Sequence, residues 1–80
     1  MIKTYRKTAT IQAEQFDGSD EMMIRYFINF WRNTDNPMYH FKTLEGPMYL
    51  NIGDWIATGI KGEHWAIADD VLKASYVEVD

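Results

Sequence analysis

The sequence predicts an α+β fold in one domain of residues 1–80, with one N-terminal helix packed on a bent antiparallel sheet of five or six short strands, which could close as a small barrel. Turn residues break the apolar runs of the 43–63 segment every few residues, as in a β-meander. Only the 20–33 segment has strong helical spacing of apolar residues. Three Trp, five Tyr and four Phe supply a core for so short a chain.

The first expected strand runs from Thr8 to Phe16, because apolar and polar residues alternate along it. A helix should follow, with Ser19 as its N-cap and two acidic residues in its first turn. Its apolar stripe consists of Met23, Ile24, Phe27, Ile28 and Trp31. We expect Phe27 and Trp31 to be buried against the sheet.

Tyr26 and Phe30 lie four residues apart on a strip that flanks this stripe. They widen the apolar surface of the expected helix beyond what one small sheet can cover. Aromatic side chains are enriched in interfaces, so Tyr26 and Phe30 are candidates for contact with a second copy or a protein partner. The alternative is that the loop from Thr34 to Pro37 folds back and buries both within the chain.

Two strands are expected next, joined by a turn at Glu45-Gly46. The first spans Tyr39 to Thr43, where aromatic residues alternate with polar ones and should face inward. The second spans Met48 to Ile52 and begins after Pro47, which suits an edge or an entry to a strand.

The remaining chain should hold a central strand and a closing strand. Residues 55–60 are apolar on both faces, so we expect a central strand that pairs with residues 64–67 through a tight turn at Lys61-Gly62. Asp69-Asp70 is expected to cap one helical turn. The closing strand is expected from Ser75 to Val79.

Composition narrows the class of function. The formal net charge is −4 and there is no Cys, so the chain offers no disulfide and no thiolate metal site, which favours a reducing, cytoplasmic setting. Net acidity disfavours nucleic acid as a partner, although Lys3, Arg6 and Lys7 surround Tyr5 in a small basic patch. No apolar run has the length of a signal peptide or a membrane span. We expect a soluble protein that does not contact membranes.

The candidate chemical groups are few. His40 and His64 are the only histidines, and neither has a further ligand at a metal-binding spacing. Glu63 beside His64 could act in acid–base chemistry, as could Asp54, but both positions are typical of turns. We therefore expect no catalytic residue, no metal and no cofactor, and we predict that the protein is not an enzyme.

Several blocks of the sequence resemble a family of small uncharacterised phage and prophage proteins. The matching blocks, in order, are Tyr5-Arg6-Lys7, Ile11 to Phe16, Thr43 to Gly46, Gly53-Asp54-Trp55-Ile56, Gly59-Ile60-Lys61-Gly62-Glu63 and an aromatic near the end, Tyr76. The resemblance implies an origin in a phage or prophage and a location in the cytoplasm of a bacterial host cell. It supplies no catalytic or binding residue.

The sequence is therefore compatible with two functions. The first is a non-enzymatic phage or prophage accessory protein that binds a host or phage protein, of which an anti-defence role is one form. The alternative is a small-barrel module that binds nucleic acid or a small ligand by stacking on Tyr5, Trp55 or Trp65.

Overall fold

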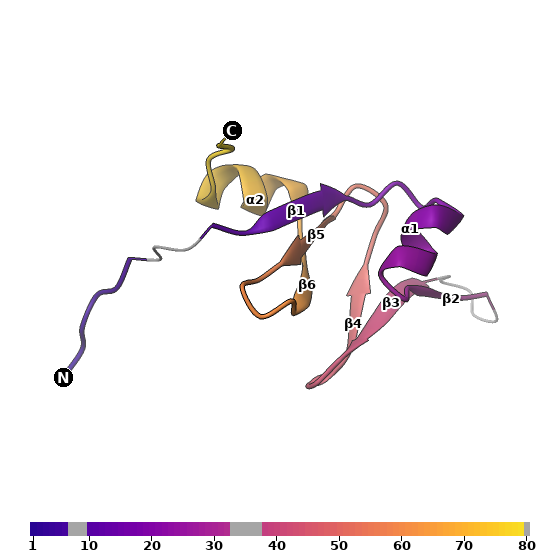
Figure 1. The fold of residues 1–80 in the computed structure, drawn as a ribbon, viewed down its shortest axis with the longest axis horizontal. Coiled ribbons are helices and arrows are strands. Elements are labelled where there is room, and N and C mark those ends of the chain that lie inside the picture. The colour runs from indigo at the N-terminus through magenta and orange to yellow at the C-terminus, as the bar shows by residue number, and fades with distance from the viewer. Residues whose placement is uncertain (7–9, 33–37, 80) are drawn as a thin grey trace.

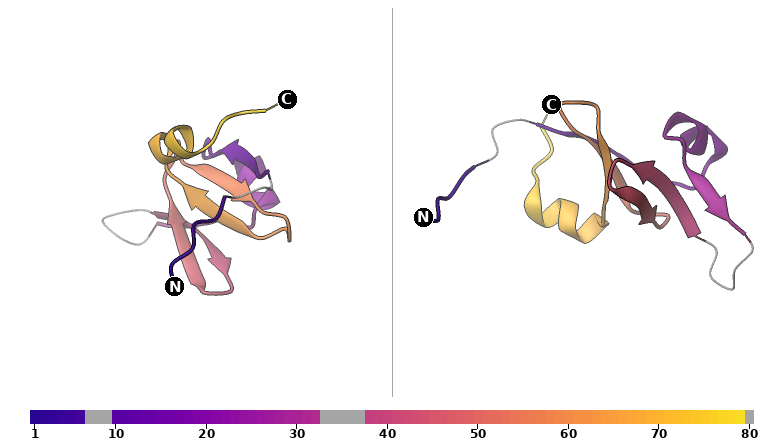
Figure 2. Two further views of the ribbon diagram at one scale, coloured as in Figure 1. Left: turned by 90° about the vertical axis from the view of Figure 1, so that its left-hand side faces the viewer. Right: turned by 90° about the horizontal axis from the view of Figure 1, so that it is seen from below.

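The computed structural model describes residues 1–6, 10–32 and 38–79, and shows an α+β fold (Figure 1, Figure 2). Its elements are β1 (Gln12–Gln15), α1 (Asp20–Arg25), β2 (Asn29–Trp31), β3 (Met38–Thr43), β4 (Gly46–Leu50), β5 (Trp55–Thr58), β6 (His64–Ile67) and α2 (Asp69–Ser75). The strands form two antiparallel sheets of three, with the orders β1-β5-β6 and β2-β3-β4.

The prediction of a single bent sheet, open to closure as a barrel, is wrong. Strands β4 and β6 lie beside each other, but the described residues form no strand ladder between them. Instead the backbone N–H of Ala66 in β6 donates to Met48 Sδ in β4, over 3.0 Å. The two sheets share one core, formed by Phe16, Met22, Ile28, Phe41, Leu50 and Ile56.

The prediction of a central strand at the end of the meander is confirmed. Strand β5 lies between β1 and β6, and its Ile56 and Ala57 are completely buried although they point to opposite faces. The strand stops at Thr58, earlier than expected, and Ile60 is exposed. The turn is a three-residue loop closed by the Gly59 N–H to Glu63 carbonyl bond, with Gly62 at a φ of +80° as in a G1 bulge.

The first helix is much shorter than predicted, and it follows β1, so it is not N-terminal. Ser19 caps it as expected, because the Met22 N–H donates to Ser19 Oγ over 3.2 Å. Two bonds close its other end in a Schellman motif: Ile28 N–H to the Met23 carbonyl at 2.8 Å, and Phe27 N–H to the Ile24 carbonyl at 3.4 Å. The helix is thus only six residues long.

Phe27 takes the left-handed position of this motif, with a φ of +55°. Its side chain is 84% exposed, and Trp31, now in β2, is 49% exposed, so the expected burial of both against the sheet is wrong. The aromatic run from Tyr26 to Trp31 favours extended backbone as much as helix, and alternation then buries Ile28 and turns Phe27 and Trp31 outward.

The predictions of the first strand and of the two strands after the helix hold with shifted ends. Strand β1 is confined to four residues, and residues 8–9 of the expected strand lie outside the described part of the chain, as do Lys7 and the 33–37 loop. Strands β3 and β4 form the expected hairpin. Its turn is at Leu44-Glu45, where Thr43 Oγ1 accepts from the Glu45 N–H and donates to the Gly46 carbonyl.

The C-terminal region differs from the prediction in two respects. Helix α2 has seven residues, and its N-cap is Ala68, so Asp69-Asp70 occupies the first turn and does not cap it. Residues 76–79 form no strand. Asp69 is used instead to fix α2 on the β1-β5-β6 sheet, because its Oδ1 accepts a 2.8 Å bond from Trp55 Nε1.

Candidate functional site

The β2-β3-β4 sheet has an apolar face on each side. Residues opposite each other in an antiparallel ladder point to the same face. Phe30 pairs with Tyr39, which pairs with Leu50, and this row faces the core. The alternate positions share the outer face: they are Asn29, Lys42 and Pro47, together with a group of four large side chains, Trp31, Met38, His40 and Tyr49. We call these four residues the aromatic face.

Ring contacts hold the aromatic face together. The ring centroid of Trp31 lies 4.5 Å from that of His40 and 6.1 Å from that of Tyr49, and His40 lies 6.0 Å from Tyr49. Trp31, Met38 and Tyr49 remain 49%, 39% and 43% exposed. A solvated face of an antiparallel sheet usually carries polar residues, so an aromatic one indicates a surface that contacts another molecule.

One hydrogen-bonding atom of His40 lies beneath the aromatic face. Its Nδ1 is buried between the neighbouring side chains and has no hydrogen-bond partner among the residues described. A buried nitrogen without a partner costs free energy, because it loses its hydration and receives nothing in exchange.

Tyr26, predicted as an interface residue, is half-buried within the chain. Its hydroxyl donates to Glu14 Oε1 over 2.7 Å, and its ring meets His64 edge-on with centroids 5.2 Å apart. Burial, reinforced by the neighbouring carboxylate, raises the pKa of Tyr26. Phe30, the other predicted interface residue, is also partly covered, because it packs on Tyr39 with ring centroids 4.5 Å apart.

An ion-pair network joins α1 to β1 beside Tyr26. Arg25 Nη1 donates to both carboxylate oxygens of Glu14, at 2.6 and 2.8 Å, and its Nη2 donates to Glu21 at 2.7 Å. These bonds from Arg25, followed by that from Tyr26, lower the pKa of Glu14, and the same carboxylate raises the pKa of Arg25. The arrangement satisfies its own charges, so we assign it to the stability of the fold.

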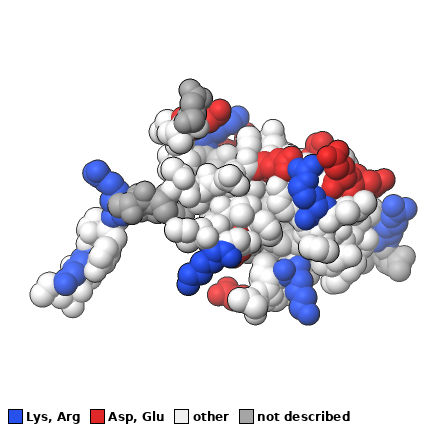
Figure 3. Space-filling model, viewed as in Figure 1, with Lys and Arg blue, Asp and Glu red and all other residues white. Residues whose placement is uncertain are grey.

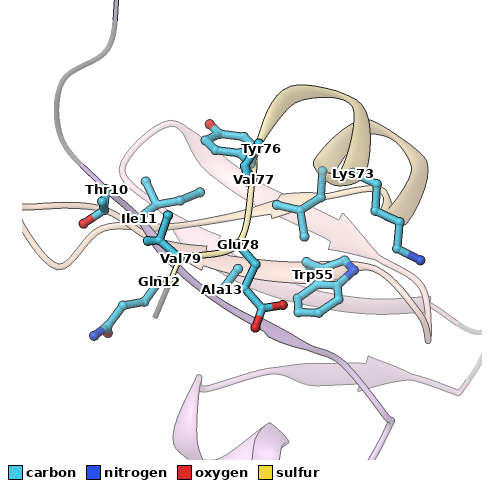
Figure 4. Close-up of a pocket in the computed structure, with 11 residues that line it drawn as sticks. Thr10, Ile11, Gln12, Ala13, Trp55, Lys73, Tyr76, Val77, Glu78 and Val79 are labelled. Carbon is cyan, nitrogen blue, oxygen red and sulfur yellow. The ribbon is translucent and has the colours of Figure 1, made fainter.

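The three aromatic residues of the ligand-binding alternative are not brought together. Trp55 lines a half-open cavity of about 700 Å³ between β1, β5 and α2 (Figure 4). Ile11, Ala13, Leu72 and Tyr76 form much of its apolar lining. Trp65 projects from β6 and is not part of this lining, and Tyr5 stands 84% exposed near the N-terminus.

The histidines do not form a metal centre in the part of the chain that the structure describes, where no three potential ligands of the His, Cys, Asp or Glu type are grouped. His40 stands in the aromatic face, and His64 shares a 2.9 Å hydrogen bond between its Nδ1 and Thr58 Oγ1. Neither of the two described helices has the length and apolarity that crossing a bilayer requires.

Sequence reasoning missed the aromatic face because it placed Trp31 on a helix. A signal for it was present: from Ile28 to Trp31 and again from Met38 to Phe41, the chain alternates between two sets of large side chains. Comparison with known proteins adds no assignment, since no family model, no curated protein and no solved structure matches this chain.

Proposed function

We propose that this chain is a non-enzymatic accessory protein that binds a protein partner through the aromatic face. The observation that carries the proposal is the row of half-exposed Trp31, Met38 and Tyr49 on a sheet whose other face already forms the core. Trp and Tyr dominate the binding energy of many interfaces, and Met adapts its shape to the partner.

The size of the surface suits the centre of an interface. A Trp or Tyr side chain that is about half exposed offers on the order of 100 Å². The aromatic face therefore amounts to a few hundred Å², which is the scale of functional patches on monomers and about a third of one side of a standard interface. The surrounding polar residues would form the rim.

The resemblance to phage and prophage proteins supports a host or phage protein as the partner, inside a bacterial cell. The resemblance rests on the order of the blocks from Tyr5 to Tyr76 and not on any single block. An anti-defence role is a specific form of this proposal.

The proposal is tested with three single variants. The tagged protein is used to isolate a partner from bacterial lysate, and the Kd of that partner is then measured for Trp31→Ser, Tyr49→Ser and Leu44→Ser. Leu44 is the control because it is fully exposed at the tip of the β3–β4 hairpin. Each aromatic substitution should weaken binding by about 30-fold or more, and Leu44→Ser should change it little. Equal affinities for all three variants would refute the role of this surface.

A second candidate function is the binding of a small apolar ligand in the cavity beside Trp55. Its volume of about 700 Å³ is within the range of small-molecule sites, and Trp55 supplies a ring for stacking. Ligand binding there should change tryptophan fluorescence in the Trp65→Phe variant and not in Trp55→Phe. The same change in both variants would exclude the cavity as the site.

A further inference from the structure

Strand β1 has a free edge. In the β1-β5-β6 sheet it is a terminal strand, and no described strand pairs with its outer side. The Phe16 N–H donates to the Asp54 carbonyl, next to β5, and backbone groups alternate along a strand. The N–H and C=O groups of Ile11, Ala13 and Gln15 consequently point away from β5, where they can accept a further strand.

The residues before β1 carry exposed apolar and basic side chains. Residues 1–6 extend away from the rest of the molecule as an arm (Figure 1). Ile2 and Tyr5 on this arm are 97% and 84% exposed. Lys3 and Arg6 form no ion pair with any described residue, and the arm holds no acidic residue (Figure 3).

The residues after β1 have the opposite charge. Residues 16–25 hold three acids against the single base Arg25, a net charge of −2, and Arg25 is itself paired with Glu14 of β1. Asp17 and Asp20 have no ion pair among the described residues. Figure 3 shows these acidic side chains gathered at the end of the molecule that carries α1, away from the arm. The basic arm is therefore too far from the acidic end of its own chain to neutralise it.

We propose that two copies of this chain form a symmetric dimer by pairing their β1 edges antiparallel, with the basic arm of each copy on the acidic α1 end of the other. Two-fold pairing of the same edge is self-complementary, so it closes at two copies and leaves neither β1 edge free. It would join the two β1-β5-β6 sheets into one sheet of six strands.

The antiparallel geometry itself brings the opposite charges together. With the two-fold axis at Ala13, positions equally far from the axis lie opposite each other, so Ile11 pairs with Gln15 of the other copy. In such a pair the N-terminal side of each β1, where the arm lies, meets the C-terminal side of the other β1, where α1 follows. The basic side of one copy therefore lies beside the acidic side of the other. This surface is separate from the aromatic face.

A charge-swap experiment tests the proposal. One variant carries Lys3→Glu and Arg6→Glu, and the other carries Asp20→Lys and Glu21→Lys. Sedimentation equilibrium measures self-association of each variant and of an equal mixture. Each variant alone should dimerise about 10- to 100-fold more weakly than the original chain, because like charges then meet at both ends of the pair. In the mixture every arm meets an opposite charge, so a heterodimer of near-original affinity should form.

A control and a backbone variant complete the test. The control variant carries Glu45→Lys and Glu63→Lys on two hairpin turns. It changes the net charge by the same amount as Asp20→Lys with Glu21→Lys and should leave dimerisation unchanged. Ala13→Pro removes an N–H that the monomer does not use, so the variant should keep its circular dichroism spectrum and lose the dimer. A monomeric original chain with a Kd weaker than about 1 mM, a mixture no tighter than its components, or a dimer that persists in Ala13→Pro would each overturn the proposal. So would a dimer abolished by Trp31→Ser.

Discussion

Replacing Phe27 by Gly should stabilise the protein relative to replacing it by Ala. Phe27 has a φ of +55°, a conformation that costs a residue with a Cβ about 1 to 2 kcal/mol and costs Gly almost nothing. Relative to Ala, Gly also stabilises the unfolded state by about 0.4 to 1 kcal/mol, because it gives the unfolded chain more conformational freedom, and this offsets part of the gain. The Gly variant should therefore exceed the Ala variant by roughly 0.5 to 1 kcal/mol, or about 2 to 8 °C in Tm.

The loss of the Phe27 side chain itself should be small. It is 84% exposed, so about 30 Å² of a side chain of roughly 200 Å² is buried. At about 25 cal/mol per Å², Phe27→Ala should cost under about 1 kcal/mol. A helix that continued through this position with the ring in the core would instead give about 3 to 5 kcal/mol for the same substitution.

Ile24 provides the matched control. It is also exposed and lies inside α1, where Gly is about 1 kcal/mol worse than Ala. Urea unfolding followed by circular dichroism on Phe27→Ala, Phe27→Gly, Ile24→Ala and Ile24→Gly should show the order of Gly and Ala reversed between the two sites. If Gly is the less stable residue at both, position 27 is helical and the assigned end of α1 is incorrect.

Two further variants test side-chain contacts. The pKa of Glu14 is lowered mainly by Arg25, so its stabilising effect should be present above about pH 4.5 and lost as pH falls through the lower, folded-state value. Glu14→Gln should lower the free energy of unfolding by under about 1 kcal/mol at pH 7. Between pH 7 and pH 3, the urea midpoint of this variant should fall less than that of the original chain. An equal fall in both proteins would argue against this role of Glu14. Gly18→Ala should be at least about 0.5 kcal/mol worse than Gly62→Ala, because both have φ near +80° but only a Cβ on Gly18 would lie 2.8 Å from Ile52. Equal melting temperatures would show that Ile52 moves aside freely.

The β5–β6 hairpin could be predicted because two signals agree there. Residues 55–58 are apolar on both faces, which only a covered central strand can satisfy, and Gly62 marks the adjoining loop. Local sequence therefore determined both the type of element and its place in the sheet. The division of the strands into two sheets depends on how β4 meets β6, which is a tertiary contact without a pattern in either strand.

The 20–31 segment was mispredicted because its residues satisfy two periods at once. Large apolar residues occupy most of these positions, so helical spacing can be found among them even though a strand begins at Asn29. The usual signal for a helix end is Gly at the left-handed position, and here that position is Phe27. Without a Gly or Pro, the turn depends on burying Ile28 in the core, which the sequence alone does not show.

The pairing of β1 with β5 has a consequence for the order in which the protein folds. Gln15 lies opposite Trp55, 40 positions later, whereas the β3–β4 hairpin joins Thr43 to Gly46 and the β5–β6 hairpin joins Thr58 to His64. Both hairpins can close from nearby residues, but β1 must wait until the whole intervening segment is in place. We therefore expect β1, although synthesised before every other element, to dock last, in a slow step that leaves one edge of β5 unpaired until it is complete.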